Sequence, residues 1–141
     1  MNRYHLMSYT KLKLNSIYGN GSWDETLRQT LLGIKNWKPM NDIANINCLE
    51  RHNETDELFI LLSGSCTLLY ANETADGLKL EAVEMEPGRV YNIPRSLWHN
   101  TVTEHDTKLA LIEDVSTGPA NSDNYDLSEA QIAELHRLLN R

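Results

Sequence analysis

The chain has 141 residues, with 13 lysines and arginines against 20 aspartates and glutamates, and a formal net charge of −7. This length is typical of one domain, and 40% hydrophobic with 23% charged residues is a globular rather than a disordered composition. Nucleic acids and anionic membranes are bound through clustered basic residues, so the acidic balance argues against both as partners.

Nothing in the sequence indicates a membrane span or a secretory signal. The longest apolar runs, 58–62 and 109–112, are far shorter than the roughly 20 residues that cross a bilayer. The first residues lack the apolar segment of a signal peptide. We therefore expect a cytoplasmic protein in which Cys48 and Cys66 are buried free thiols rather than a disulfide.

Short segments with a period of two follow one another along most of the chain. Residues 1–24 carry scattered aromatic side chains and are expected to form an arm or an edge strand. The strands expected after the arm are 28–34, 43–50, 57–62, 66–71, 79–85, 90–93, 99–103 and 108–114. Turn residues (Gly, Asn, Asp and Pro) separate these segments, which predicts an antiparallel sandwich or barrel.

The C-terminal end changes character. After a polar stretch at 116–126, Ser128 and Gln131 form a capping box that predicts a helix start. Leu127 and Ile132 are placed to form its hydrophobic staple. The resulting division is an N-terminal arm (1–24), a β-barrel (25–115), and a polar linker with a short helix (116–141).

Polar residues with metal-binding chemistry gather around the segment 50–57. Glu50 and His52 are two residues apart in an expected strand, so their side chains point to the same face. Glu57 opens the next strand and can fold back toward that face. The arrangement resembles the first motif of the cupin superfamily: Gly, five residues, His-x-His, three or four residues, Glu, six residues, Gly. His52, Glu57 and Gly64 match it, whereas Glu50 and Ala44 stand in place of the first His and the first Gly.

A second region resembles the second cupin motif: Gly, five residues, Pro-x-Gly, two residues, His, three residues, Asn. Gly88, Pro94 and His99 match in the same register. Ser96 replaces the second Gly, and Thr103 replaces the closing Asn. The two motifs occur in the right order, and the resemblance implies an all-β fold, the cupin double-stranded β-helix (jelly-roll) barrel.

The cupin resemblance also implies a metal site. His52, Glu57 and His99 occupy three of the four usual ligand positions. Glu50 is a fourth ligand, a general base beside a three-ligand metal, or a solvated carboxylate. Such a mixed nitrogen and oxygen set suits Fe, Mn, Zn or Ni as a divalent ion, and the sequence does not choose among them.

Four acids crowd into eight residues: Glu50, Glu54, Asp56 and Glu57. A bound cation would relieve the repulsion among carboxylates that share one cavity. The alternative is that Glu54 and Asp56 belong to a solvated turn.

A more local likeness concerns the substrate. Glu50-Arg51-His52, Thr55, Phe59 and Trp98-His99 resemble the ureidoglycolate lyase branch of cupins, whose substrate is an α-hydroxy acid bearing a ureido group. The expected function is that of a metal-dependent lyase, isomerase or hydrolase acting on a small polar acid or sugar derivative, or of an oxygenase with iron and O₂. The alternatives are a non-catalytic cupin that binds a small molecule or sugar, and a structural or interaction module. Since small cupins commonly pair through their sheets, a homodimer is expected.

Overall fold

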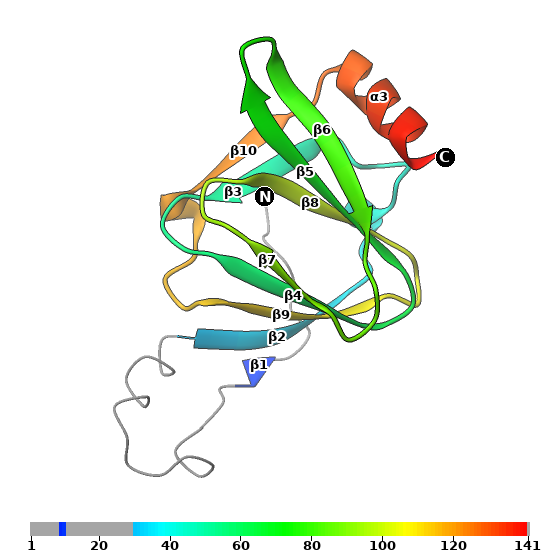
Figure 1. The fold of residues 1–141 in the computed structure, drawn as a ribbon. Helices are drawn as coiled ribbons and strands as arrows, with labels where there is room; N and C mark the ends of the chain where they lie inside the picture. Colours follow the sequence, from blue (N-terminus) through cyan, green and yellow to red (C-terminus); the bar gives the residue numbers. More distant parts are fainter. Residues whose placement is uncertain (1–8, 11–29, 141) are drawn as a thin grey trace.

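The computed structural model describes residues 9–10 and 30–140 (Figure 1). Most of the arm expected over 1–24 lies outside these residues. The described part of the arm, β1 (Tyr9–Thr10), is an edge strand that pairs with β2 (Thr30–Asn36). The other elements are η1 (Pro39–Asn41), β3 (Cys48–His52), β4 (Glu57–Ser63), β5 (Cys66–Thr74), β6 (Gly77–Glu84), β7 (Val90–Ile93), β8 (Trp98–Thr103), β9 (Lys108–Asp114), η2 (Pro119–Asn121), β10 (Ser122–Asp126) and α3 (Glu129–Leu139).

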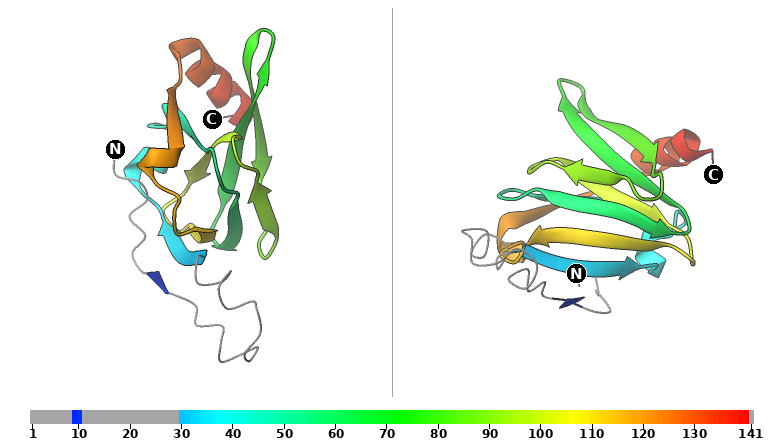
Figure 2. Two further views of the ribbon diagram at one scale, coloured as in Figure 1. Left: turned by 90° about the vertical axis from the view of Figure 1, so that its left-hand side faces the viewer. Right: turned by 60° about the horizontal axis from the view of Figure 1, so that its bottom comes forward.

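The strands form two five-stranded sheets that face each other. The first has the order β1-β2-β9-β4-β7 and the second β10-β3-β8-β5-β6. Neighbouring strands pair antiparallel, as the alternating sequence pattern predicts. In Figure 2 the two sheets lie as layers, and α3 lies beside the second sheet. The all-β expectation is confirmed.

Two strand predictions differ from the structure. The strand expected at 43–50 begins only at Cys48, because a turn follows η1 and occupies 43–45. Part of the segment predicted as a polar linker is a strand, since β10 pairs with β3 along its whole length. The β10 sequence, Ser-Asp-Asn-Tyr-Asp, has no apolar alternation because no residue of this edge strand is fully buried.

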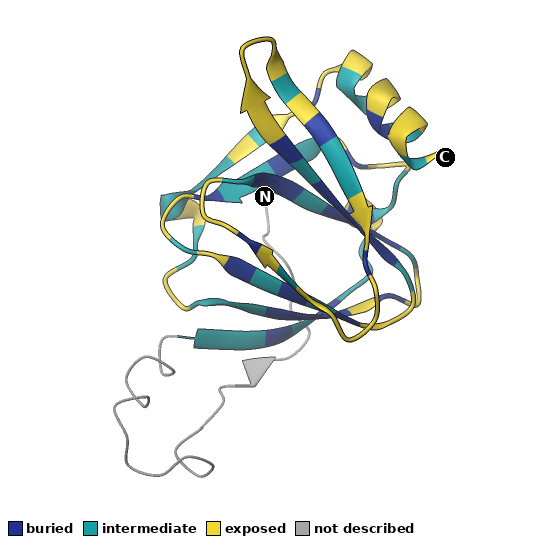
Figure 3. Cartoon of the chain, viewed as in Figure 1, coloured by how far each residue is buried: buried dark blue, intermediate teal, exposed yellow. Residues whose placement is uncertain are grey.

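The chain builds two apolar cores, one on each face of the second sheet. The core between the sheets contains Phe59, Leu61, Cys66, Leu68, Met85, Ile93, Leu109 and Leu111. The core between the second sheet and α3 contains Ile46, Leu49, Leu69, Ala71, Leu80, Trp98, Val102, Leu127 and Leu135. Successive strand side chains point to opposite faces, so strand β5 contributes to both cores and is buried over most of its length (Figure 3).

The helix forms as its capping sequence predicts. Ser128 Oγ accepts from the Gln131 amide at 3.2 Å, and Gln131 Oε1 accepts from the Ser128 amide at 2.9 Å. Leu127 is buried and Ile132 packs against the same core, so both staple residues lie in one cluster. No described helix is both long enough and apolar enough to cross a bilayer.

The two faces of β4 differ in burial. Glu57, Phe59 and Leu61 face the interior and are buried, in agreement with the alternation. On the opposite face, Leu62 is 52% exposed.

Candidate metal centre

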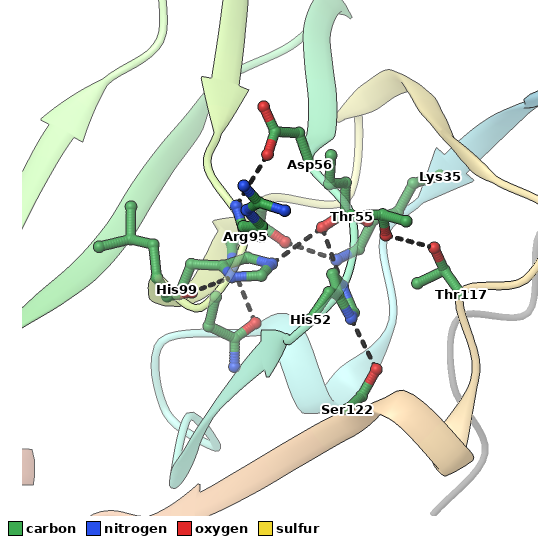
Figure 4. A network of polar contacts seen from close by, with 12 residues as sticks. Lys35, His52, Thr55, Asp56, Arg95, His99, Thr117 and Ser122 are labelled. Atoms are coloured by element: carbon green, nitrogen blue, oxygen red, sulfur yellow. Dashed lines mark hydrogen bonds and ion pairs between the residues drawn. The ribbon is translucent and has the colours of Figure 1, made fainter.

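Strands from both sheets bring the predicted donors together in the interior. On β3, Leu49 packs in the core on the α3 side of the sheet, whereas Glu50 and His52 point to the opposite face. Glu50 is paired with His99 where β3 pairs with β8. Glu57 enters from β4, in the other sheet. The labelled side chains of His52 and His99 point toward each other in Figure 4. The turn after β3 thus folds Glu57 back over the two imidazoles.

One carboxylate oxygen lies at the centre of the site. Glu57 Oε2 is 3.2 Å from His52 Nε2 and 2.8 Å from His99 Nε2. The relative exposures of Glu57, His52 and His99 are 0%, 3% and 0%. Ligand atoms at about 2.1 Å from one ion, and at right angles about it, lie about 3.0 Å apart. The two nitrogen–oxygen distances therefore already match the spacing of donor atoms that share one ion.

Hydrogen bonds on the far side of each ring fix its orientation. His99 Nδ1 donates to the carbonyl of Leu97 at 2.9 Å, so the Nε2 of the neutral ring is left with a lone pair. His52 Nδ1 lies 2.9 Å from Ser122 Oγ, on β10. Such partners commonly orient histidine ligands of metals. Strand β10 therefore supports the site as well as the sheet.

The electrostatics of Glu57 favour its ionised form. Burial alone would raise the pKa of the carboxyl group, but the hydrogen bonds to His52 and His99 outweigh burial and lower this pKa to about 2. Burial would likewise lower the pKa of His99, whereas the hydrogen bond and charge of Glu57 raise it above its ordinary value. A negative oxygen and two imidazoles thus stabilise one another in the interior.

The donors fit a divalent cation. Glu57 Oε1 is buried and has no hydrogen-bond partner, which is costly for a carboxylate oxygen unless something binds it. Two overlapping groups place their donor atoms within 4.8 Å of one another: Glu50 with His52 and His99, and His52 with Glu57 and Glu113. Imidazole nitrogen and carboxylate oxygen suit Zn, Fe, Mn or Ni.

The structure separates the four clustered acids into two kinds. Glu50, half-buried, and Glu57 belong to the donor groups. Asp56 instead accepts from the backbone amide of Arg95 at 2.9 Å, and Glu54 accepts from the Asn121 amide at 3.1 Å. The charge argument for a cation therefore applies to Glu50 and Glu57, whereas the other two acids hold loops.

Two charged residues of the interior were not predicted from the sequence. Glu113 lies opposite Glu57 in the pairing of β9 with β4 and joins the second donor group. Its alternation with Leu109 and Leu111 was a usable signal, because all three share one face. Lys35 of β2 is 1% exposed, and its Nζ donates to Thr101 Oγ1 at 2.6 Å. No local pattern marks this lysine as buried.

The turns of the two motifs position the ligands. Ser96, in place of the motif glycine, has a left-handed φ of 67°, and its amide donates to the carbonyl of His52 at 2.7 Å. Gly64 has a φ of 70°, and a Cβ there would lie 2.7 Å from the backbone of Asp106. The glycine at 64 is required by both its conformation and this close approach.

The sequence matches no protein-family model and no curated protein. Among solved structures, a cupin-2 domain containing protein from Shewanella frigidimarina NCIMB 400 is 16% identical, with 81% of this chain and 84% of that chain covered, at a TM-score of 0.46. Oxalate decarboxylase from Bacillus subtilis is 16% identical, with 67% of this chain and 23% of that chain covered, at a TM-score of 0.48. An oxalate oxidase is 16% identical, with 68% of this chain and 48% of that chain covered, at a TM-score of 0.50. This chain thus spans about half the length of that oxidase and has the cupin fold.

Proposed function

We propose that the protein binds a divalent metal ion through His52, Glu57 and His99, and that it acts on a small polar acid or sugar derivative within the barrel. The observation that carries this proposal is the convergence of two Nε2 atoms on Glu57 Oε2, at 2.8 and 3.2 Å, beside the unpartnered Oε1. A cation bound among these atoms would take the place of the protons in the two hydrogen bonds and would give the buried Oε1 a partner.

The chemistry that suits the site is lyase, isomerase or hydrolase chemistry. A bound divalent ion supplies a Lewis acid that lowers the pKa of a water or alcohol. Glu50 then acts as the proton acceptor at its carboxylate, or as a fourth donor to the ion. Its position beside His99 and His52 supports both roles. Redox chemistry with O₂ requires iron in the site.

The alternative is a small-molecule-binding cupin without catalysis. Two departures from the motifs favour it: Glu50 in place of the first histidine, and Thr103 in place of the closing asparagine. The two functions differ in whether loss of metal abolishes turnover or only ligand binding.

The experiment is elemental analysis of the purified protein and of its variants His52→Ala, His99→Ala and Glu57→Gln. We expect about one divalent ion per chain in the wild type and a loss of at least about tenfold in affinity in each variant. The identity of the bound ion distinguishes acid-base chemistry from redox chemistry.

The matched control is His105→Ala, because His105 is an exposed histidine that stacks on Trp37 away from the donors. This variant should keep the wild-type metal content. A wild type that takes up no ion after dialysis against Mn, Fe, Ni and Zn salts would overturn the metal proposal. The same conclusion follows if the His52 and His99 variants retain their metal.

A further inference from the structure

A glutamate outside both sequence motifs faces the candidate metal centre from β9. Glu113 is directly opposite Glu57 where β9 pairs with β4. Residues opposite each other in an antiparallel pair share one face of the sheet, with their Cβ atoms about 4.5–5.5 Å apart. Leu109 and Leu111, which alternate with Glu113, are buried between the sheets, so this face of β9 is the inner one. Glu113 therefore points into the interior beside Glu57.

The carboxylate of Glu113 lies close to two of the proposed ligands. One donor atom from each of His52, Glu57 and Glu113 lies within 4.8 Å of the other two. Ligands on opposite sides of an ion, each about 2.1 Å from it, are about 4.2 Å apart. Small rotations of the side chains thus bring all three atoms onto one ion. A carboxylate has two oxygens, so Glu113 can coordinate an ion through one oxygen and keep other contacts through the second.

Glu57 has an oxygen that the two histidines leave unused. Its Oε2 contacts both imidazoles, at 2.8 and 3.2 Å, whereas its Oε1 is buried without a hydrogen-bond partner. A buried carboxylate oxygen without a partner opposes folding. An ion held by Glu57 together with the neighbouring Glu113 would give this oxygen a partner.

The two overlapping donor groups differ in composition. Glu50 is grouped with both imidazoles, whereas Glu113 is grouped with Glu57 and one imidazole. Glu50 comes from β3 and Glu113 from β9, which belong to opposite sheets. The two carboxylates therefore reach the site from different sides, and coordination by Glu113 leaves Glu50 in place as a proton acceptor.

We propose that Glu113 is a protein ligand of the ion held by His52, Glu57 and His99, and that this second carboxylate suits the site to six-coordinate Mn²⁺ or Fe²⁺ rather than tetrahedral Zn²⁺. The inference rests on the proposed function, since it concerns the ion of that same site. Three protein donors and one water or substrate already complete the shell of a catalytic Zn²⁺. Carboxylate oxygens suit Mn²⁺, and two histidines with a carboxylate suit Fe²⁺.

The test measures the affinities for Mn²⁺ and Zn²⁺, by competition with a chelator, in the wild type, Glu113→Gln and Glu113→Asp. Glutamine has the shape of glutamate but is a poorer ligand, and aspartate keeps the charge on a shorter side chain. A site of nitrogen and oxygen donors generally binds Zn²⁺ more tightly than Mn²⁺, so the informative quantity is the change in each affinity. We expect both variants to lose about 10- to 100-fold in Mn²⁺ affinity, as loss of supporting contacts already does, and to lose less in Zn²⁺ affinity.

A second readout reports on the coordination of the ion itself. Bound Mn²⁺ speeds the relaxation of water protons more strongly when it carries more exchangeable waters, and a water should replace the missing carboxylate in Glu113→Gln. The matched control is Asp114→Asn, which removes the same charge from the opposite face of β9 and keeps an oxygen that accepts from the Ser116 amide. This control should have wild-type affinities and wild-type relaxation. Circular dichroism confirms folding, and Glu113→Asp alone decides if Glu113→Gln does not fold.

The outcomes are distinct. Weaker Mn²⁺ binding in both Glu113 variants, with more water on the ion, supports the proposal. Unchanged Mn²⁺ affinity in Glu113→Gln overturns it, and so does wild-type affinity in Glu113→Asp, because a charge acting at a distance would then suffice. Either result leaves the metal function standing. Equal losses for Mn²⁺ and Zn²⁺ overturn the assignment of the ion class, and a wild type that binds neither ion overturns the proposed function itself.

Discussion

Glu57 stabilises a proton on the imidazole of His99, and a metal ion bound there would compete with this proton. Its Nδ1 donates to Leu97, and Glu57 stabilises a proton on Nε2, which raises the pKa above the ordinary value of 6.5. A metal requires the Nε2 lone pair, so protons and metal compete for this atom. Residue-level electrostatics thus couples metal binding to pH.

We expect metal affinity to decrease as the pH falls through the raised pKa of His99, and metal binding near neutral pH to release protons. The competition arises because the group whose pKa is raised is protonated over a wider pH range. Calorimetry of metal binding in phosphate and in Tris, at the same pH, measures the number of protons released. Equal affinities at pH 8 and pH 6, with no proton release, would contradict this coupling.

The thiols show how one residue type acquires two environments. Cys66 lies in the core between the sheets, and burial raises its pKa to about 12. Cys48 is half-buried at the start of β3, and burial raises its pKa as well. Both thiols are free, as the sequence predicts, but the prediction that both are buried is correct only for Cys66. Neither has the lowered pKa that marks a reactive cysteine.

At the scale of the element, the turn between β7 and β8 has a left-handed residue that is not a glycine. Ser96 adopts a left-handed φ of 67°, which disfavours residues with a side chain. Two hydrogen bonds hold the turn in this conformation: the Ser96 amide donates to the His52 carbonyl, and the Arg95 amide donates to the Asp56 carboxylate. The left-handed Ser96 is thus joined by one hydrogen bond to the backbone of His52, a candidate metal ligand.

We expect Ser96→Gly to increase the free energy of unfolding by about 0.5–1 kcal/mol, because glycine relieves the left-handed strain of about 1 kcal/mol. Urea denaturation measures this change. Ser116→Gly, in an exposed turn without positive φ, is the control and should be neutral or slightly destabilising. Destabilisation by Ser96→Gly would show that the serine side chain has a stabilising contact that outweighs the strain.

On the outer side of the second sheet, a different group of contacts joins strands. The Arg51 guanidinium lies 4.4 Å from the Trp98 ring centroid and contacts Asp123 at 3.0 Å. Trp98 Nε1 donates to Glu73. These contacts link β3, β8, β5 and β10 on the face opposite the donors. The Glu-Arg-His and Trp-His sequences therefore place Arg51 and Trp98 outside the site and His52 and His99 inside it.

At the scale of the whole molecule, the first sheet has an outer face that is partly apolar. Leu58 and Ile60 are half-buried there, while Leu62 and Val90 are 52% and 58% exposed. Ile60 pairs with Val90 across β4 and β7 and shares its face of β4 with Leu62, two residues away, so the four side chains belong to one surface. Contiguous apolar surface of this kind commonly marks a protein interface.

We expect the protein to be a homodimer that pairs through this face. Light scattering after size-exclusion chromatography measures the mass in solution. Leu62→Glu should shift the mass toward the monomer, whereas Leu138→Glu, an exposed leucine of α3, should leave it unchanged. A monomeric wild type at micromolar concentration would contradict the expectation.

The sequence by itself determined most of the fold and predicted that His52, Glu57 and His99 would meet. Alternation of apolar and polar residues predicted the strands, and the capping box predicted α3, because both signals are local. The spacing of His52, Glu57 and His99 predicted that they meet, since each lies at a fixed position relative to a turn. The structure places all three within hydrogen-bond distance of one carboxylate oxygen.

Only the tertiary structure decided which further charges enter the interior. Lys35 and Thr101 are 66 residues apart, and Glu113 reaches Glu57 through the pairing of β9 with β4. Strand β10 became visible only as the partner of β3. These features depend on which strands become neighbours, and that is fixed by burial across the whole sheet. A single exposed-looking lysine or a polar strand has no local signal of its final environment, and the alternation around Glu113 indicates the face that it takes but not the residues that it meets.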